Sequence, residues 1–132
     1  MRLLLDTHIV LSIINEQTGD LPAPLRGLLA DPDSEYYVSV ASLWEIAIKW
    51  RLGKLKLSSG LELLPDLVTN SGLVLIPINE HHVIATVQPE PMTRDPFDRL
   101  LLAQCSVEKL RLVTIDRALI AHSLAVRPNS GT

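Results

Sequence analysis

The chain has 132 residues, of which 47% are hydrophobic and 20% are charged, so wholesale disorder is excluded and the length suits one folded domain. Aromatic residues make up only 4%, which argues against a surface that binds single-stranded nucleic acid mainly by base stacking. The single cysteine, Cys105, excludes an internal disulfide framework and a multi-cysteine zinc site, and the formal net charge of −3 excludes a generally basic surface.

The first residues resemble the start of a signal peptide, because an arginine precedes three leucines. Asp6 ends this apolar run before it reaches signal length, and no small-residue cleavage site follows. No segment approaches the roughly 20 apolar residues that a membrane span requires. We therefore expect a cytoplasmic protein that does not interact with a membrane.

Four short apolar runs lack alternation with polar residues, which predicts strands that are covered on both faces, as in a parallel sheet. In chain order these runs are 2–5, 36–40, 73–78 and 112–115. Segments with helical spacing of apolar residues lie between them, at 8–15, 24–30, 42–52, 60–70, 80–87 and 96–110, and a brief helical turn follows Asp116. This alternation predicts one α/β domain over residues 1–132, with a parallel sheet between helical layers and a frayed tail from about residue 127.

Four acidic residues are predicted to lie at the same edge of that sheet, where open α/β sheets form their sites. Asp6 directly follows the first predicted strand and Asp116 the last one. Glu45 and Asp98 are each predicted to lie in the first turn of a helix, the former just after the second strand. We expect all four carboxylates to point toward this edge.

Each of these acidic residues taken alone has an ordinary explanation as a helix cap. The segment 42–45 reads Ser-Leu-Trp-Glu, which is a capping box with Glu45 at its third position. Asp95 followed by Pro96 is a typical helix start, with Asp98 favourable to the helix dipole. Asp6 and Asp116 are equally suited to cap the helices that follow them.

The convergence of the four carboxylates is not explained by capping, because like charges brought together repel one another unless a cation offsets them. Hard oxygen ligands without cysteine or paired histidine ligands favour Mg²⁺ or Mn²⁺. The sequence therefore predicts a divalent-metal site that contains Asp6, Glu45, Asp98 and Asp116.

The motifs that carry these acids resemble those of the PIN-domain nucleases, and in particular the VapC-type toxins of bacterial toxin–antitoxin modules. The matching segments occur in family order over almost the whole chain, at 3–8, 42–49, 95–99 and 113–116. One position departs from many relatives, which have a histidine where this chain has Thr93. That histidine is not among the metal ligands of the family, so the departure concerns the contacts of the loop.

The resemblance implies a three-layer α/β/α PIN fold with a central, mainly parallel sheet of about four to five strands. It implies a metal-dependent endoribonuclease, a phosphodiester hydrolase that acts with Mg²⁺ or Mn²⁺ and leaves 5′-phosphate and 3′-hydroxyl ends. The metal ligands and catalytic residues of the family correspond here to Asp6, Glu45, Asp98 and Asp116. Thr7 and Thr114 correspond to hydroxyl-bearing positions beside that site.

Basic residues near the acidic positions are candidates for contacts with substrate phosphates. The 15 acidic residues fall to 11 when the four site carboxylates are set aside, against 12 Lys and Arg, so the remaining surface is not acidic. The candidate phosphate ligands are Arg94, Arg99, Arg117 and Lys49. The basic run that continues from Lys49 through Arg51, Lys54 and Lys56 suits either phosphate contacts or a solvated helix face.

The resemblance also implies protein partners: a small cognate antitoxin that covers the acidic pocket, and a second copy of the chain in a homodimer. Apolar residues near Glu45 suit a groove for the antitoxin or, equally, the core; they are Trp44, Ile48, Trp50 and Leu52. We expect His8 to serve for packing or a hydrogen bond on the helix after Asp6, and Cys105 to lie in the core.

Rival readings fare less well on the residues. A response-regulator receiver domain has paired acids after its first strand, whereas Asp6 stands alone, and it has a lysine after its last strand, where this chain has Asp116-Arg117. A phosphatase of the haloacid-dehalogenase type has a second aspartate where this chain has His8. Two alternatives keep the fold: a catalytically degenerate PIN domain that serves as a protein-binding scaffold, and a structure-specific DNA nuclease.

Overall fold

The computed structural model describes residues 1–127 and contains a sheet of four parallel strands in the order β3-β2-β1-β4. The strands are β1 (Arg2–Leu5), β2 (Glu35–Ser39), β3 (Val74–Ile76) and β4 (Arg111–Val113). Each lies within a residue or two of a predicted run, so the predicted parallel α/β architecture is confirmed. The frayed tail predicted from about residue 127 lies almost wholly outside the described residues.

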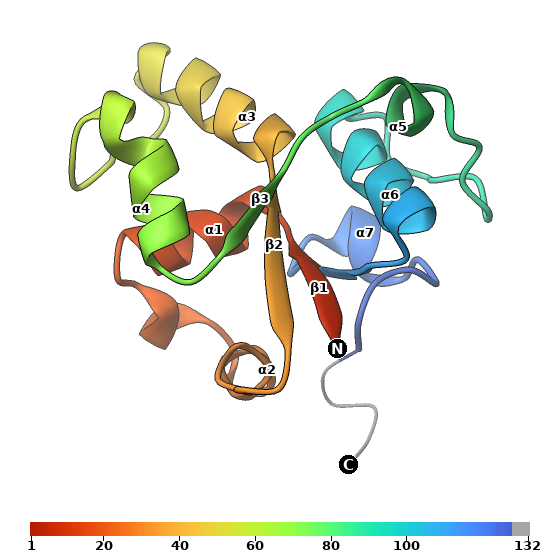
Figure 1. The fold of residues 1–132 in the computed structure, drawn as a ribbon, viewed down its shortest axis with the longest axis horizontal. Coiled ribbons are helices and arrows are strands. Elements are labelled where there is room, and N and C mark those ends of the chain that lie inside the picture. The colour runs from red at the N-terminus through yellow and green to blue at the C-terminus, as the bar shows by residue number, and fades with distance from the viewer. Residues whose placement is uncertain (128–132) are drawn as a thin grey trace.

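Helices cover both faces of this sheet (Figure 1). The α-helices are α1 (Thr7–Ile14), α2 (Ala23–Leu29), α3 (Val40–Arg51), α4 (Leu64–Asn70), α5 (Glu80–Ile84), α6 (Pro96–Glu108) and α7 (Arg117–Ile120). Two 3₁₀ turns, η1 (Thr18–Asp20) and η2 (Leu61–Leu63), lie between α1 and α2 and between α3 and α4.

Alternate side chains of β1 divide the core into two parts. Leu3 and Leu5 pack with residues of α1 to α4, whereas Leu4 packs with residues of α6 and α7 on the other face. All three leucines are fully buried, as expected for a central strand covered on both sides. Cys105 is buried in the second part, which confirms the core position expected for it.

The ends of the strands set the position of the site. Because all four strands are parallel, their carboxyl ends meet at one edge of the sheet. Helix α1 begins there after β1, α3 directly after β2, and α7 a few residues after β4. The opposite edge, called here the amino edge, carries α2 (Figure 1). Strand β3 is shorter than the run 73–78 because Pro77 has no N–H to donate to the sheet.

Candidate active site

A cavity of about 340 Å³ at the carboxyl edge of the sheet collects all four acidic residues that the sequence singles out. We call it the acidic cavity. Its lining residues are Asp6, Thr7, His8, Leu11, Glu45, Lys49, Asp95, Asp98, Ile115 and Asp116. Asp6, Glu45 and Asp98 are buried and Asp116 is exposed, so three carboxylates are largely withdrawn from solvent around this cavity.

Asp6 stands between β1 and α1 and both of its carboxylate oxygens accept hydrogen bonds. Oδ1 accepts from the backbone N–H of Thr7 at 2.7 Å as the N-cap of α1, and Oδ2 accepts from the hydroxyl of Thr114 at 2.6 Å. Burial raises the pKa of Asp6, the two hydrogen bonds lower it, and the nearby charges of Glu45 and Asp116 raise it further. Asp6 is thus both a helix cap and a member of the site.

Glu45 lies deeper in its helix than predicted. Helix α3 begins at Val40, because the Ser39 hydroxyl caps it by accepting from the N–H of Ala41 at 3.0 Å. The prediction of a capping box that starts at Ser42 is therefore wrong, and Glu45 lies in the second turn rather than the first. Its side chain is free of any capping role and faces the acidic cavity.

The carboxylate of Glu45 is held by two partners from different elements. The Thr7 hydroxyl donates to Oε1 at 2.6 Å, and the same hydroxyl lies 2.9 Å from that of Ser42. The ammonium group of Lys49 lies 2.8 Å from Oε2, one helical turn further along α3. Ser42 lies in the matching segment 42–49, but the sequence predicts it to cap the helix, so its contact with Thr7 was not predicted.

Asp98 lies in the first turn of α6, as predicted from the residues before it. Asp95 is the N-cap, accepting from the N–H of Phe97 at 2.8 Å, and Pro96 occupies the first helical position. The pKa of Asp98 is raised to about 7, first by burial and then by the negative charges of Asp95, Asp6 and Asp116. Asp98 is the carboxylate on which the repulsion between these acids is most evident.

Thr93, in the loop before α6, supports Asp98. Its hydroxyl donates to Oδ2 of Asp98 at 3.3 Å and accepts from the N–H of Asp95 at 3.2 Å. Thr114 acts similarly on the other side: besides donating to Asp6, its hydroxyl accepts from the N–H of Asp116 at 2.9 Å. Two buried threonines therefore fix the positions of three of the four acids.

Of the four basic candidates, Lys49 alone lines the acidic cavity. The hydrogen bond to Glu45 raises the pKa of Lys49 despite partial burial, and the charges of Asp95 and Asp98 act in the same direction. Arg99 instead braces the preceding loop, donating to the carbonyls of Thr93 and Pro91 and pairing with Glu90. Arg94 and Arg117 are exposed and lie outside the cavity lining.

The donor set suits a hard divalent cation. All of its candidate ligands are carboxylate oxygens, the type that Mg²⁺ and Mn²⁺ prefer, and their mutual repulsion is the property that a dication relieves. Within residues 1–127, no group of three or more His, Cys, Asp or Glu side chains stands at metal-ligand spacing. The carboxylates therefore line one cavity without standing close enough together to form a complete ligand set in this structure.

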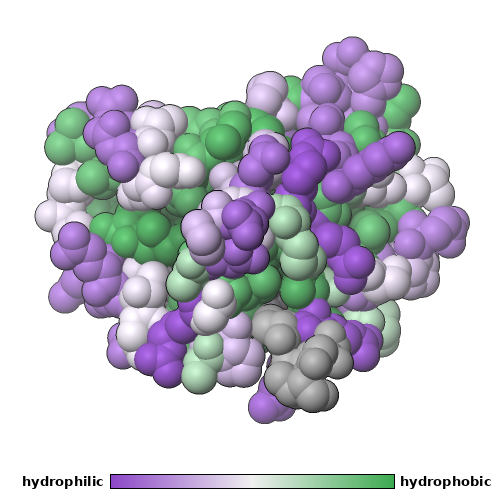
Figure 2. Space-filling model, turned by 60° about the horizontal axis from the view of Figure 1, so that its bottom comes forward, coloured by the Kyte–Doolittle hydropathy of each residue, from purple (hydrophilic) through white to green (hydrophobic). Residues whose placement is uncertain are grey.

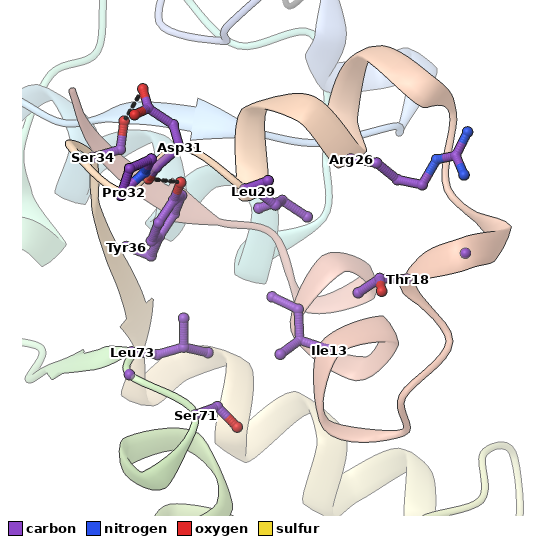
Figure 3. A pocket seen from close by; sticks show the side chains of 13 residues that line it. Ile13, Thr18, Arg26, Leu29, Asp31, Pro32, Ser34, Tyr36, Ser71 and Leu73 are labelled. Atoms are coloured by element: carbon purple, nitrogen blue, oxygen red, sulfur yellow. Dashed lines mark hydrogen bonds between the residues drawn. The ribbon is translucent and has the colours of Figure 1, made fainter.

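A second cavity, of about 580 Å³, lies at the amino edge of the sheet and is larger than the acidic one (Figure 3). Asp31 is its only carboxylate, and both oxygens of that group accept hydrogen bonds, from the N–H of Asp33 and the hydroxyl of Ser34. The hydroxyl of Tyr36 lies 2.8 Å from the carbonyl oxygens of Leu28 and Asp31. The view of Figure 2, turned toward this edge, shows hydrophobic patches set among hydrophilic side chains. This cavity lacks the clustered charge that marks the acidic one.

Comparisons with known proteins agree with this fold. The profile of the PIN domain family matches residues 3–123. Two solved structures are similar at 17% sequence identity and a TM-score of 0.61: a toxin–antitoxin complex from Klebsiella pneumoniae, and VapBC2 from Rickettsia felis bound to a DNA fragment from their promoter. The alignments cover 96% of this chain in both cases, and 97% and 96% of the respective neighbour. A search of curated proteins gives no match.

Proposed function

This chain belongs to the PIN domain family, and from that premise we propose that it is a metal-dependent endoribonuclease that serves as the toxin of a toxin–antitoxin module. PIN domains are generally nucleases. The observation that carries the proposal for this chain is the acidic cavity itself, in which three buried carboxylates and Asp116 face one another and the pKa of Asp98 is raised to about 7. Such repulsion lowers the stability of the folded chain, and clustered carboxylates with raised pKa values are typical of functional sites.

Asp6, Glu45, Asp98 and Asp116 are the residues that would hold Mg²⁺ or Mn²⁺. The ion, when bound, would stabilise negative charge on the phosphodiester and lower the pKa of water for the hydrolysis. Thr114 keeps Asp6 turned into the cavity, and Thr93 does the same for Asp98. Thr7 orients Glu45 through Oε1.

Lys49 supplies the positive charge that the protein itself contributes to this cavity. Its ammonium group, bound to Oε2 of Glu45, offsets part of the negative charge of the cavity in the metal-free state. We propose that Lys49 is also the basic residue that meets the substrate phosphate, because it is the lysine that lines the cavity. Arg94 and Arg117 remain candidates for more distant phosphates, whereas Arg99 serves the loop 90–93.

A cognate antitoxin and a homodimer belong to the same proposal. The two similar structures described above are a toxin–antitoxin complex and VapBC2. On this chain, Trp44 is 61% exposed and Leu52 63% exposed, and Trp50 is also exposed, so these residues are available to a partner rather than buried in the core. No helix within residues 1–127 is long and apolar enough to cross a membrane. We propose a cytoplasmic location, to be checked by fractionation, and light scattering of the purified chain tests the dimer.

The activity is tested by incubating a panel of end-labelled RNAs with the purified protein in Mg²⁺ or Mn²⁺, with and without EDTA. The proposal expects cleavage that needs the metal, leaves 5′-phosphate ends, and is lost in Asp6→Asn and Asp98→Asn. Asp31→Asn is the matched control, because Asp31 is a carboxylate of the amino-edge cavity. Cleavage that persists in EDTA or in both site variants would overturn the metal-dependent mechanism.

A further inference from the structure

The acidic cavity continues into a neighbouring cavity of about 640 Å³ along α1. Three residues, His8, Leu11 and Ile115, line both cavities, so the two adjoin. We call the second one the α1 cavity. Its volume lies within the range of roughly 300–1,000 Å³ that is usual for ligand sites.

Hydrogen bonds hold the walls of the α1 cavity in place. The side-chain amide of Asn15, at the end of α1, donates to the carbonyl of Lys56 and accepts from the N–H of Ser58, at 3.3 Å each. The N–H of Lys54 donates to the carbonyl of Lys49 at 2.8 Å, which ties the start of this loop to α3. The loop that forms one wall is therefore fastened both to α1 and to the helix that carries Glu45.

The lining of the α1 cavity combines apolar surface with free polar groups. Leu21, Leu55 and Leu57 supply apolar surface. The side chains of Gln17 and Lys56 are exposed, and neither makes a side-chain hydrogen bond or ion pair within residues 1–127. The apolar floor and the unpaired amide suit a flat group that has apolar faces and a polar edge. The rim also carries the exposed carboxylate of Asp20, so the unpaired ammonium group of Lys56 is the part of the lining that suits an anion.

We propose that the α1 cavity binds the nucleoside that adjoins the scissile phosphate, and so contributes to the choice of cleavage site. The inference rests on the proposed function, because it places the phosphate of that nucleotide in the acidic cavity. The base lies against the leucines, Gln17 hydrogen-bonds to its edge, and Lys56 contacts the next phosphate along the strand. His8, at the junction, lies beside the sugar between the two cavities.

The test uses calorimetry with Mn²⁺ and defined small probes: the 5′- and 3′-monophosphates of the four ribonucleosides, and ribose 5-phosphate as the probe without a base. The proposal expects at least one nucleotide to bind about tenfold more tightly than ribose 5-phosphate, the gain for burying part of one base. If ribose 5-phosphate binds in a Mn²⁺-dependent manner and no base improves on it, the α1 cavity is not a nucleoside site and the nuclease proposal stands. If the protein binds neither Mn²⁺ nor any phosphate probe, both proposals fail.

Two exposed variants locate the effect. Gln17→Ala is expected to weaken the preferred nucleotide about three- to tenfold, the value of one hydrogen bond, and to leave ribose 5-phosphate unchanged. Lys56→Ala is expected to weaken the binding of a trinucleotide without changing that of a mononucleotide. Lys54→Ala is the matched control, since Lys54 lies two residues away in the same loop but does not line the cavity. Equal effects of Lys54→Ala and Lys56→Ala, or no effect of Gln17→Ala, would overturn the assignment.

Discussion

The cavities at the two edges of the sheet differ in how the polar and acidic side chains that line them are arranged. At the amino edge, the carboxylate of Asp31 and the hydroxyl of Tyr36 already have partners within a few residues of the chain. At the carboxyl edge, Asp6, Glu45 and Asp98 come from three separate elements and face one another. The larger of the two cavities is therefore the one without a cluster of carboxylates.

This difference shows that charge left uncompensated by the fold indicates a site better than cavity volume does. Local hydrogen bonds such as those of Asp31 stabilise a turn, and no second carboxylate lines that cavity to repel Asp31. The acids of the other edge are fixed by threonines and Lys49, yet burial and mutual repulsion still raise the pKa values of Asp6 and Asp98. A bound cation relieves that remaining repulsion, as does a proton on Asp98 below about pH 7.

The largest expected effect comes from exchanging one carboxylate for its neutral amide at each edge. Asp98→Asn is expected to lower the cleavage rate by about 10²- to 10³-fold, because a ligand of the transition-state charge is lost, and to leave the free energy of unfolding in EDTA equal or higher. Asp31→Asn is expected to keep the cleavage rate and to lower the free energy of unfolding by about 0.5–1.5 kcal/mol. Cleavage rates and urea denaturation of both variants test this expectation. The reverse pattern would place the chemistry at the amino edge and contradict the proposed site.

The next largest effect concerns the threonine that joins Asp6 to Asp116. Thr114→Val removes a donor to a buried carboxylate and an acceptor from a backbone N–H. We expect a loss of about 1–3 kcal/mol in the free energy of unfolding, together with slower cleavage. Thr69→Val is the control, because the exposed Thr69 hydroxyl donates to backbone carbonyls of its own helix, those of Pro65 and Asp66. Equal losses in the two variants would show that the Thr114 hydroxyl has no special role.

The pH dependence of stability in EDTA sharpens the comparison further. Because the pKa of Asp98 is about 7 in the folded chain and 3.8 ordinarily, the folded state holds the proton more tightly. The contribution of Asp98 to stability is therefore present below about pH 4 and is lost as the pH rises to about 7. We expect the advantage of Asp98→Asn over the unaltered chain to widen over that interval, measured by urea denaturation at pH 4 to 8. A constant difference between the two proteins would contradict the raised pKa.

The smallest effect is expected for the internal cation. Lys49→Met removes the ammonium group that competes with a metal ion for Glu45. We expect the metal-free variant to lose about 1 kcal/mol or less in the free energy of unfolding, because Lys49 is half exposed, and Mn²⁺ to bind several-fold more tightly. Calorimetry beside Lys54→Met as the control measures this. Weaker Mn²⁺ binding in Lys49→Met would show that the lysine assists the metal instead of substituting for it.

Most of the acidic cavity was accessible from the sequence because its members stand at element ends. Asp6, Asp98 and Asp116 are each fixed by a strand end or a helix cap, both of which have local signals. Glu45 had a misleading local signal, since Ser39 and Ser42 are both good caps and only the packing of α3 against the rest of the chain decides between them. Thr93 contacts Asp98 five residues further on, and Lys49 pairs with Glu45 one helical turn away, so both contacts are local; the sequence alone does not show which partner each side chain contacts, because that depends on how the elements pack.

The fold was predicted in its order and direction more completely than in its boundaries. Apolar runs that lack alternation identified all four described strands, although the edge strand β3 is partly exposed. The predicted boundaries differ from the observed ones in two places. Strand β3 ends at Ile76, before Pro77, and helix α5 ends at Ile84 rather than Val87. The two cavities could not be distinguished from the sequence, because their walls come from elements far apart along the chain.

Direct titration of Mn²⁺ into the purified protein, with Asp98→Asn and Asp31→Asn beside it, tests the central claim that the carboxyl edge is a divalent-metal site. We predict that the unaltered chain and Asp31→Asn bind Mn²⁺ alike and that Asp98→Asn binds it at least about tenfold more weakly. Absence of Mn²⁺ binding by the unaltered chain, or equal binding by all three proteins, would contradict the claim.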